Sequence, residues 1–291
     1  MSRQHFHIYG VLIVGLLAAT GTVGQSARSK SDADIDLIGN RKVARGPNLY
    51  SPEREIELGN NLAAIIEKSS KFINDDAVTE YVNGVAQKVE QNSDKHAGIT
   101  IKLIDSEESK SFTLPGGHQY ITKGMLLRLQ NEGELASALA RGIAHTALRS
   151  NTRLATQTEL AVWVEPFPVM VPVYENAARR TSALVKLKEK RDSELDADYF
   201  GIQYLYKSGY DTKCFLDFVA LATDGDKNVP TILRTDPPLP QRLELLEKEV
   251  TRILPKRAGA VISTTEFQEF RSRIQTLKPA IIPSEPTTKS N

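Results

Sequence analysis

The sequence predicts a mostly helical α+β fold with a small sheet, and two patterns carry this prediction. From residue 123 almost to the end, apolar residues recur at helical spacing, as they do in residues 135–143. Before that point, residues 99–103 alternate apolar with polar side chains, and a second short strand at residues 119–122 follows the turn Pro115-Gly116-Gly117. With 291 residues, 40% of them hydrophobic, the chain is long enough to bury its own core.

Capping residues predict where the helices begin. Ser51 is an N-cap residue followed by proline at the first helical position. Asn131 caps another helix, with Glu134 three residues later in the capping-box position. The other helices are expected from Asp76, at about 182–208 with Gly209 just beyond the end, at 241–253, and from Thr265.

The N-terminal segment, residues 1–26, is expected to be a secretory signal peptide or an N-terminal anchor. Arg3 precedes an apolar run that is shorter than the roughly 18–20 residues that span a bilayer. We therefore expect a secreted or periplasmic protein, or one held at a membrane through this segment. The rest is divided into a polar arm at 27–50, a main domain at 51–257, a C-terminal helix at 258–278 and a disordered tail at 279–291.

Composition excludes several functional classes. Thirty-seven Lys and Arg residues against 36 Asp and Glu residues give a net charge of +1, which offers no surplus of cations for binding nucleic acid. A single cysteine, Cys214, excludes an internal disulfide and any metal site built from several thiolates.

Two helices carry polar residues at a spacing that suggests a reaction centre. Arg141 and His145 are four residues apart and share one helix face, and Glu194 and Asp198 have the same spacing on a later helix. A zinc protease of the HExxH type needs two histidines one turn apart, a glutamate beside the first, and a third ligand on another helix. The window here is Arg141-Gly142-Ile143-Ala144-His145, so only the second histidine is present.

Five segments together resemble the zinc metallopeptidases of the CAAX prenyl protease and HtpX type, which include periplasmic quality-control proteases of the outer membrane. They are residues 112–126, 132–136, 143–145 and 194–201, and residues 235–238 with Arg242. The resemblance implies a zincin-like, gluzincin-type domain with zinc as its cofactor.

The resemblance also implies roles for individual residues. His145 occupies a zinc-ligand position and Glu194 the carboxylate-ligand position. Asp198 stands where the family has a carboxylate that orients a ligand histidine, with Arg242 nearby in the late loop. Pro115, Gly116, Gly117 and His118 are similar to the strand edge on which an extended peptide substrate would pair. His118 is also a candidate substitute ligand, because the resemblance places its strand near the cleft.

Three positions depart from the family pattern. Arg141 stands in place of the first histidine ligand, Gly142 in place of the general-base glutamate, and Asp236 in place of a histidine beside the site. Arginine is a permanent cation and cannot become a zinc ligand, and glycine cannot take a proton from water. We expect Arg141 to pair with Glu194, which would otherwise be a carboxylate without a partner in a cleft.

Three functional hypotheses follow from this sequence. The first is a catalytically inactive pseudopeptidase that still binds an extended peptide or an unfolded envelope protein. The alternative is an active zinc metalloendopeptidase that cleaves unfolded envelope proteins with non-standard ligands. A third hypothesis is a structural subunit of an envelope assembly. The ligand count favours the first.

Overall fold

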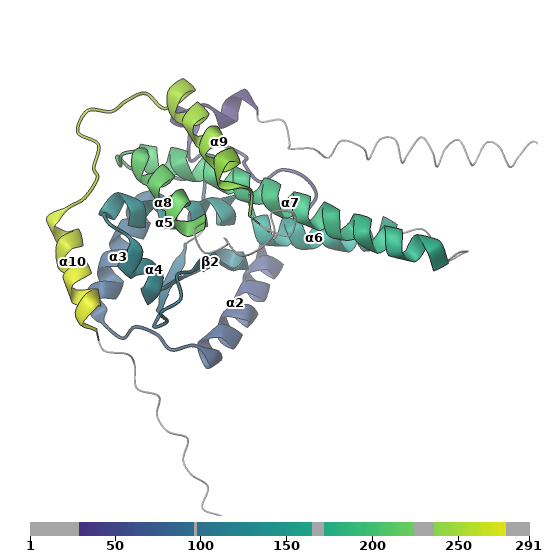
Figure 1. The fold of residues 1–291 in the computed structure, drawn as a ribbon, viewed down its shortest axis with the longest axis horizontal. Coiled ribbons are helices and arrows are strands. Elements are labelled where there is room, and N and C mark those ends of the chain that lie inside the picture. The colour runs from purple at the N-terminus through teal and green to yellow at the C-terminus, as the bar shows by residue number, and fades with distance from the viewer. Residues whose placement is uncertain (1–28, 96–97, 165–171, 224–235, 278–291) are drawn as a thin grey trace, which may run out of the picture.

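The computed structural model describes residues 29–95, 98–164, 172–223 and 236–277 (Figure 1). The predicted signal segment 1–26, the predicted tail 279–291 and Thr235 of the late loop lie outside the described residues. The helices are α2 (Pro52–Ser69), α3 (Asp76–Glu90), α4 (Lys123–Arg128), α5 (Glu132–Ala147), α6 (Ser150–Val164), α7 (Pro172–Lys207), α8 (Lys213–Thr223), α9 (Leu239–Arg252) and α10 (Thr265–Thr276). None of these helices is both long and apolar enough to cross a bilayer.

The predicted caps are present at α2 and α5, the two helices that cover the sheet. The Ser51 hydroxyl accepts a hydrogen bond from the backbone of Arg54, and the Asn131 side chain accepts one from the backbone of Glu134. Helix α7 begins at Pro172, about ten residues before its predicted start. Its end at Lys207 agrees with the prediction, because Gly209 adopts a φ of 89°.

The sheet has three strands in the order β1-β3-β2. Strand β1 (Thr100–Ile104) runs parallel to the central strand β3 (His118–Thr122), and β2 (Ser111–Thr113) runs antiparallel to it. Strand β2 is not predicted by the sequence pattern, because three residues are too few to show alternation.

The residues expected to form a substrate-binding strand edge lie in a turn. Pro115–Gly117 form the 3-10 turn η3, in which Gly116 and Gly117 have φ values of 75° and 95°. Such left-handed backbone is incompatible with a strand. His118 follows as the first residue of β3, which has a neighbouring strand on each side. The expectation of an exposed edge at these residues is therefore wrong.

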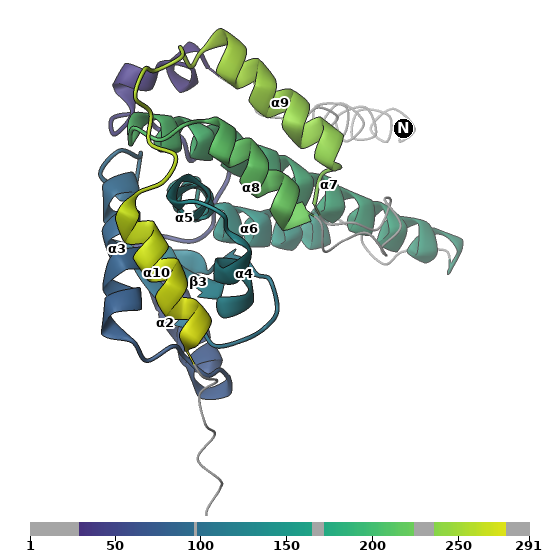
Figure 2. The same cartoon turned by 60° about the vertical axis from the view of Figure 1, so that its left-hand side comes forward.

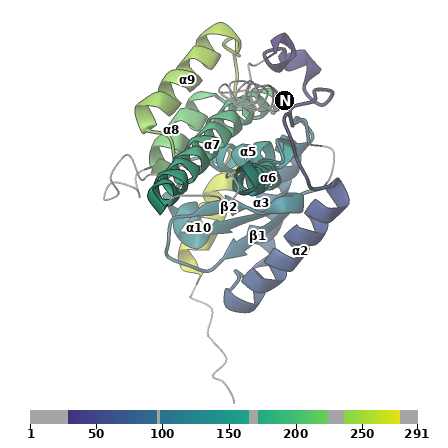
Figure 3. The same ribbon diagram turned by 90° about the vertical axis from the view of Figure 1, so that its right-hand side faces the viewer.

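The sheet lies between two helices that cover its two faces (Figures 2 and 3). Helix α2 packs Ala63 against Tyr120 on one face. On the other face, Ile121 belongs to the large core that also contains Leu139 and Ile143 of α5. Helix α5 also has extensive contacts with α7, α3 and α8, and so lies at the centre of the molecule. Figure 1 shows α6 and α7 side by side, extending beyond the body.

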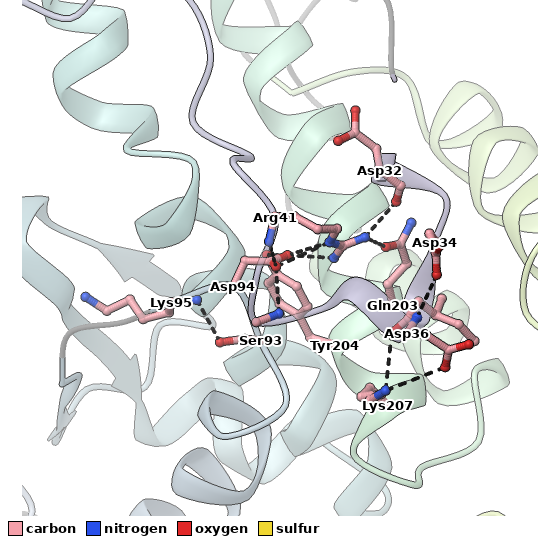
Figure 4. Close-up of polar contacts among 12 residues, drawn as sticks. Asp32, Asp34, Asp36, Arg41, Ser93, Asp94, Lys95, Gln203, Tyr204 and Lys207 are labelled. Atoms are coloured by element: carbon pink, nitrogen blue, oxygen red, sulfur yellow. Dashed lines mark hydrogen bonds and ion pairs between the residues drawn. The ribbon is translucent and has the colours of Figure 1, made fainter. Parts of the chain in front are cut away.

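The segment predicted as a polar arm is anchored in the core (Figure 4). The side chain of Arg41 is fully buried in an ion pair with Asp94 and donates a further hydrogen bond to Gln203 of α7. Ile38 and Val43 belong to the same hydrophobic core as Phe267 of α10. This core therefore runs without a break from the arm to the C-terminal helix.

Candidate functional site

A cavity of about 500 Å³ opens between strand β2 and the helices α5 and α7. Its lining combines residues that the sequence analysis singled out with others that it did not. The first group is Arg141, Gly142, His145, Glu194, Asp236 and Arg242; the second includes the β2 residues with Lys110, Asn151 and Lys190. The fold thus brings together residues up to about 130 positions apart in the chain.

Arg141 forms the predicted ion pair with Glu194. Its Nη2 donates to Glu194 Oε2, and its Nε donates to Asp198 Oδ1 at 3.0 Å. The side chain of Arg141 is 17% exposed and that of Glu194 is 14% exposed. Burial disfavours the charged guanidinium, but the carboxylates of Glu194 and Asp198 outweigh it and raise the pKa of Arg141 above its ordinary value.

Glu194 is held ionised by the cations around it. Burial by itself would raise the pKa of this carboxyl, but Arg141 and the nearby His145 hold the pKa of Glu194 well below its usual range. His145 Nε2 lies 3.3 Å from Glu194 Oε2. The two residues expected at metal-ligand positions therefore contact each other and share the carboxylate with the guanidinium.

Asp198 is completely buried behind this pair. Both of its carboxylate oxygens accept from Arg242, at 2.6 Å from Nε and 2.8 Å from Nη2, while Oδ1 also accepts from Arg141. The resemblance implied that Asp198 orients a histidine. In this structure Asp198 accepts hydrogen bonds from two guanidinium groups, and so connects α7 to α5 and α9.

Asp236 lines the same cavity on the side of the late loop. Burial and the neighbouring charge of Glu194 raise the pKa of Asp236 above its usual range, against the opposing effect of Arg141. The carboxyl of Asp236 is therefore more easily protonated than that of Glu194.

His118 is not among the residues that line the cavity. Its Nε2 lies 2.9 Å from Asn60 Oδ1 of α2, on the opposite face of the sheet from α5. Burial lowers the pKa of His118, which favours the neutral ring. The structure does not bring His118 together with His145 and Glu194, so the residues expected for a substitute metal site are separated.

Gln119 is a site residue that the sequence analysis missed. It follows His118 in β3, its side chain lies against Gly142, and its Nε2 donates to the carbonyl oxygen of Ala138 at 3.0 Å. Strand β3 carries apolar side chains on both faces, at Tyr120 and Ile121, so its pattern does not identify the polar Gln119 as buried. Only the packing of α5 on the central strand reveals it.

Comparison with known proteins identifies the family. A model of peptidase family M48 matches residues 73–250, which is more than half of the chain and includes the whole lining of the cavity. The chain belongs to peptidase family M48. The predicted fold, a mostly helical α+β metallopeptidase domain with a small sheet, is confirmed.

Several curated M48 relatives cover most of the chain. It is 24% identical over 277 residues to the beta-barrel assembly-enhancing protease of Escherichia coli (strain K12), covering 90% of this chain and 56% of that protein. It is 24% identical over 260 residues to the protein of the same name from Yersinia pestis, covering 84% and 53%. A putative beta-barrel assembly-enhancing protease of Vibrio cholerae is 26% identical over 201 residues. The chain spans about half the length of these relatives.

The M48 family is zinc-dependent, but the residues of this site do not fit that ion. The carboxylate expected to bind zinc is bonded to the permanent cation of Arg141, and the nearest imidazole, His145, contacts the same carboxylate. A second cation close to this guanidinium would be repelled. Within the described part of the chain, no group of three or more His, Cys, Asp or Glu side chains is arranged to hold a metal.

Proposed function

We propose that this chain is a catalytically inactive M48 peptidase that binds an extended polypeptide in the cavity beside β2. The observation that carries the proposal is the ion pair of Arg141 with Glu194 and Asp198. It places a guanidinium where the resemblance implies a metal ligand, and the adjacent Gly142 has no side chain to activate water. Loss of hydrolysis does not remove the cavity, so recognition can persist without it.

The free edge of β2 supports the choice of an extended polypeptide. Backbone hydrogen bonds join the two residues that flank β2 to β3: Thr122 N donates to the Lys110 carbonyl oxygen, and Leu114 N donates to the His118 carbonyl oxygen. Along an antiparallel pair of strands, residues that bond to the partner strand alternate with residues that do not. The backbone N–H and C=O groups of Ser111 and Thr113 therefore point away from β3. They point to the side that has no neighbouring strand in the described sheet, and both residues line the cavity.

Asn151 limits how far a bound strand would extend. Its Nδ2 donates to the Thr113 carbonyl oxygen at 2.8 Å, which occupies one acceptor of the free edge. Within the described part of the chain, this leaves the backbone N–H and C=O of Ser111 and the N–H of Thr113 available to a ligand strand. A short main-chain ladder at this edge is the arrangement used in β-augmentation.

The relatives suggest which polypeptides these would be. Their names associate them with the assembly of β-barrels. A β-barrel precursor supplies unpaired extended segments, which match the free edge of β2. We place the protein outside the cytoplasm, secreted or periplasmic, because of the signal-like segment 1–26.

The test uses a fluorescein-labelled peptide of ten residues that alternates polar and apolar side chains. Fluorescence anisotropy measures its binding to the full chain, and mass spectrometry of the same mixture detects cleavage. Ser111→Pro removes the edge N–H without breaking a bond to β3, and should weaken binding at least tenfold. Ser111→Ala, which keeps the N–H, is the matched control and should bind as the unaltered protein does. Equal binding by both variants would remove β2 from the proposal, and cleavage of the peptide would remove the claim of inactivity.

A further inference from the structure

The position that a general-base glutamate would need is not empty in this structure, because the side chain of Gln119 lies there. Gln119 lies in the central strand, paired with Ile101 of β1 and Thr113 of β2, and is only 2% exposed. Its amide reaches across to α5, where Nε2 bonds to the carbonyl oxygen of Ala138. Its Oε1 is buried and has no hydrogen-bond partner in the described structure. A buried acceptor without a partner is unfavourable, so something else must hold the side chain there.

Gly142 provides the space that this amide occupies. A Cβ atom added at Gly142 would lie 2.3 Å from both Cδ and Nε2 of Gln119, and 2.4 Å from its Oε1. Ala138 and Gly142 are one helical turn apart, so the amide lies flat over that turn of α5. By contrast, a Cβ added at Gly84, an exposed glycine of α3, would meet no atom within 4 Å.

We infer that Gln119 and Gly142 form a matched pair that closes the general-base position, independently of the guanidinium in the metal position. Gln119 is a positioning residue: it acts by occupying the volume that any side chain at residue 142 needs. The inference rests on the proposed function, because it gives a second structural reason for the loss of hydrolysis, besides the guanidinium of Arg141. It adds that restoring the missing motif residues alone is insufficient, because a glutamate at 142 requires Gln119 to leave.

The Gln119 side chain cannot move without cost. Rotation away from Gly142 breaks its one hydrogen bond, to Ala138, and the amide then has both polar atoms to satisfy. The effect of a substitution at residue 142 on stability should therefore depend on which side chain is present at residue 119. Valine at 119 suits a strand and lacks the three atoms that collide with a Cβ at 142, so it should release the constraint.

A double-mutant cycle with Gly142→Ala and Gln119→Val tests the pair by thermal unfolding of the full chain without ligand. Gly142→Ala should lower Tm by about 2–4 °C or more in the unaltered protein. In the Gln119→Val background it should leave Tm unchanged or raise it, since alanine favours helix over glycine. The coupling should be at least about fivefold in the unfolding equilibrium constant.

Gly84→Ala is the matched control, and should change Tm by the same amount in both backgrounds. If Gly142→Ala also shifts Tm equally in both backgrounds, the pairing is refuted. If Gly142→Ala alone yields no soluble protein, recovery of soluble protein by adding Gln119→Val supports the pair, and failure to recover it while Gln119→Val alone folds overturns it. No peptide is present in these measurements, so their outcome is separate from that of the binding test.

Discussion

Replacement of Arg141 by alanine removes the cation that Glu194 and Asp198 share. Asp198 keeps both of its bonds from Arg242, but Glu194 keeps only the contact with His145 at 3.3 Å. Breaking a buried ion pair by removing one partner costs about 3–5 kcal/mol. Arg141 and Glu194 retain 17% and 14% exposure towards the cavity. We therefore expect a loss near the lower end of that range, about 3 kcal/mol.

Replacement of the other partner, Glu194, should lower the free energy of unfolding by less, and the two losses should not add. Glu194→Ala leaves Arg141 bonded to Asp198 at 3.0 Å, so we expect a loss of about 1–2 kcal/mol. In the double variant, Glu194 is no longer present as a buried carboxylate without a cation. The total loss in the free energy of unfolding should therefore be about 3 kcal/mol, well below the sum of the single losses.

Urea unfolding followed by far-ultraviolet circular dichroism at pH 7 measures these free energies. Lys248→Ala is a useful control, because it breaks an ion pair with Glu244 in which both side chains are more than half exposed. It should leave the unfolding midpoint almost unchanged. Losses for Arg141→Ala and Glu194→Ala that add to within about 0.5 kcal/mol in the double variant would refute the pairing.

Three further predictions concern charge, anchoring and metal. The guanidinium of Arg141 overcomes the effect of burial and lowers the pKa of Glu194. The ionised form of Glu194 therefore stabilises the fold above the unfolded pKa of about 4.3, and this stability is lost as pH falls. Urea midpoints at pH 7 and pH 3 should differ less in Glu194→Gln than in the unaltered protein. Arg41→Ala removes one partner of a fully buried ion pair and should cost about 3–5 kcal/mol by urea unfolding, whereas a freely solvated arm would show no loss. In zinc titrations followed by Tm, Arg141→His with Gly142→Glu should gain no stability until Gln119→Val is added, and a zinc-dependent rise without it would contradict the closed base position.

The sequence was sufficient for the elements with strong local signals. Asn131 caps α5 as its side-chain chemistry predicts, and Gly209 follows α7 in a left-handed conformation. Strand β2 was not predictable in the same way. A three-residue strand has no periodicity to detect, whereas a proline followed by two glycines predicts the turn that the structure contains. The substrate-binding edge expected at the same residues came from the resemblance alone.

The candidate site shows the same division between local and long-range information. Helical spacing and the resemblance together identified Arg141 as a partner for Glu194, and the structure contains that contact. The burial of Gln119 depends on α5 covering one face of the central strand while α2 covers the other. The burial of Arg41 likewise depends on Asp94 and Gln203, which are 53 and 162 residues away. No local pattern reports such contacts.

Metal content of the purified full-length chain, measured together with cleavage of an unfolded protein, tests the central claim most directly. With Arg141 bonded to the carboxylate of Glu194, we predict far less than one zinc per chain and no cleavage that a chelator suppresses. One tightly bound zinc per chain, with chelator-sensitive cleavage that disappears in His145→Ala, would contradict the account.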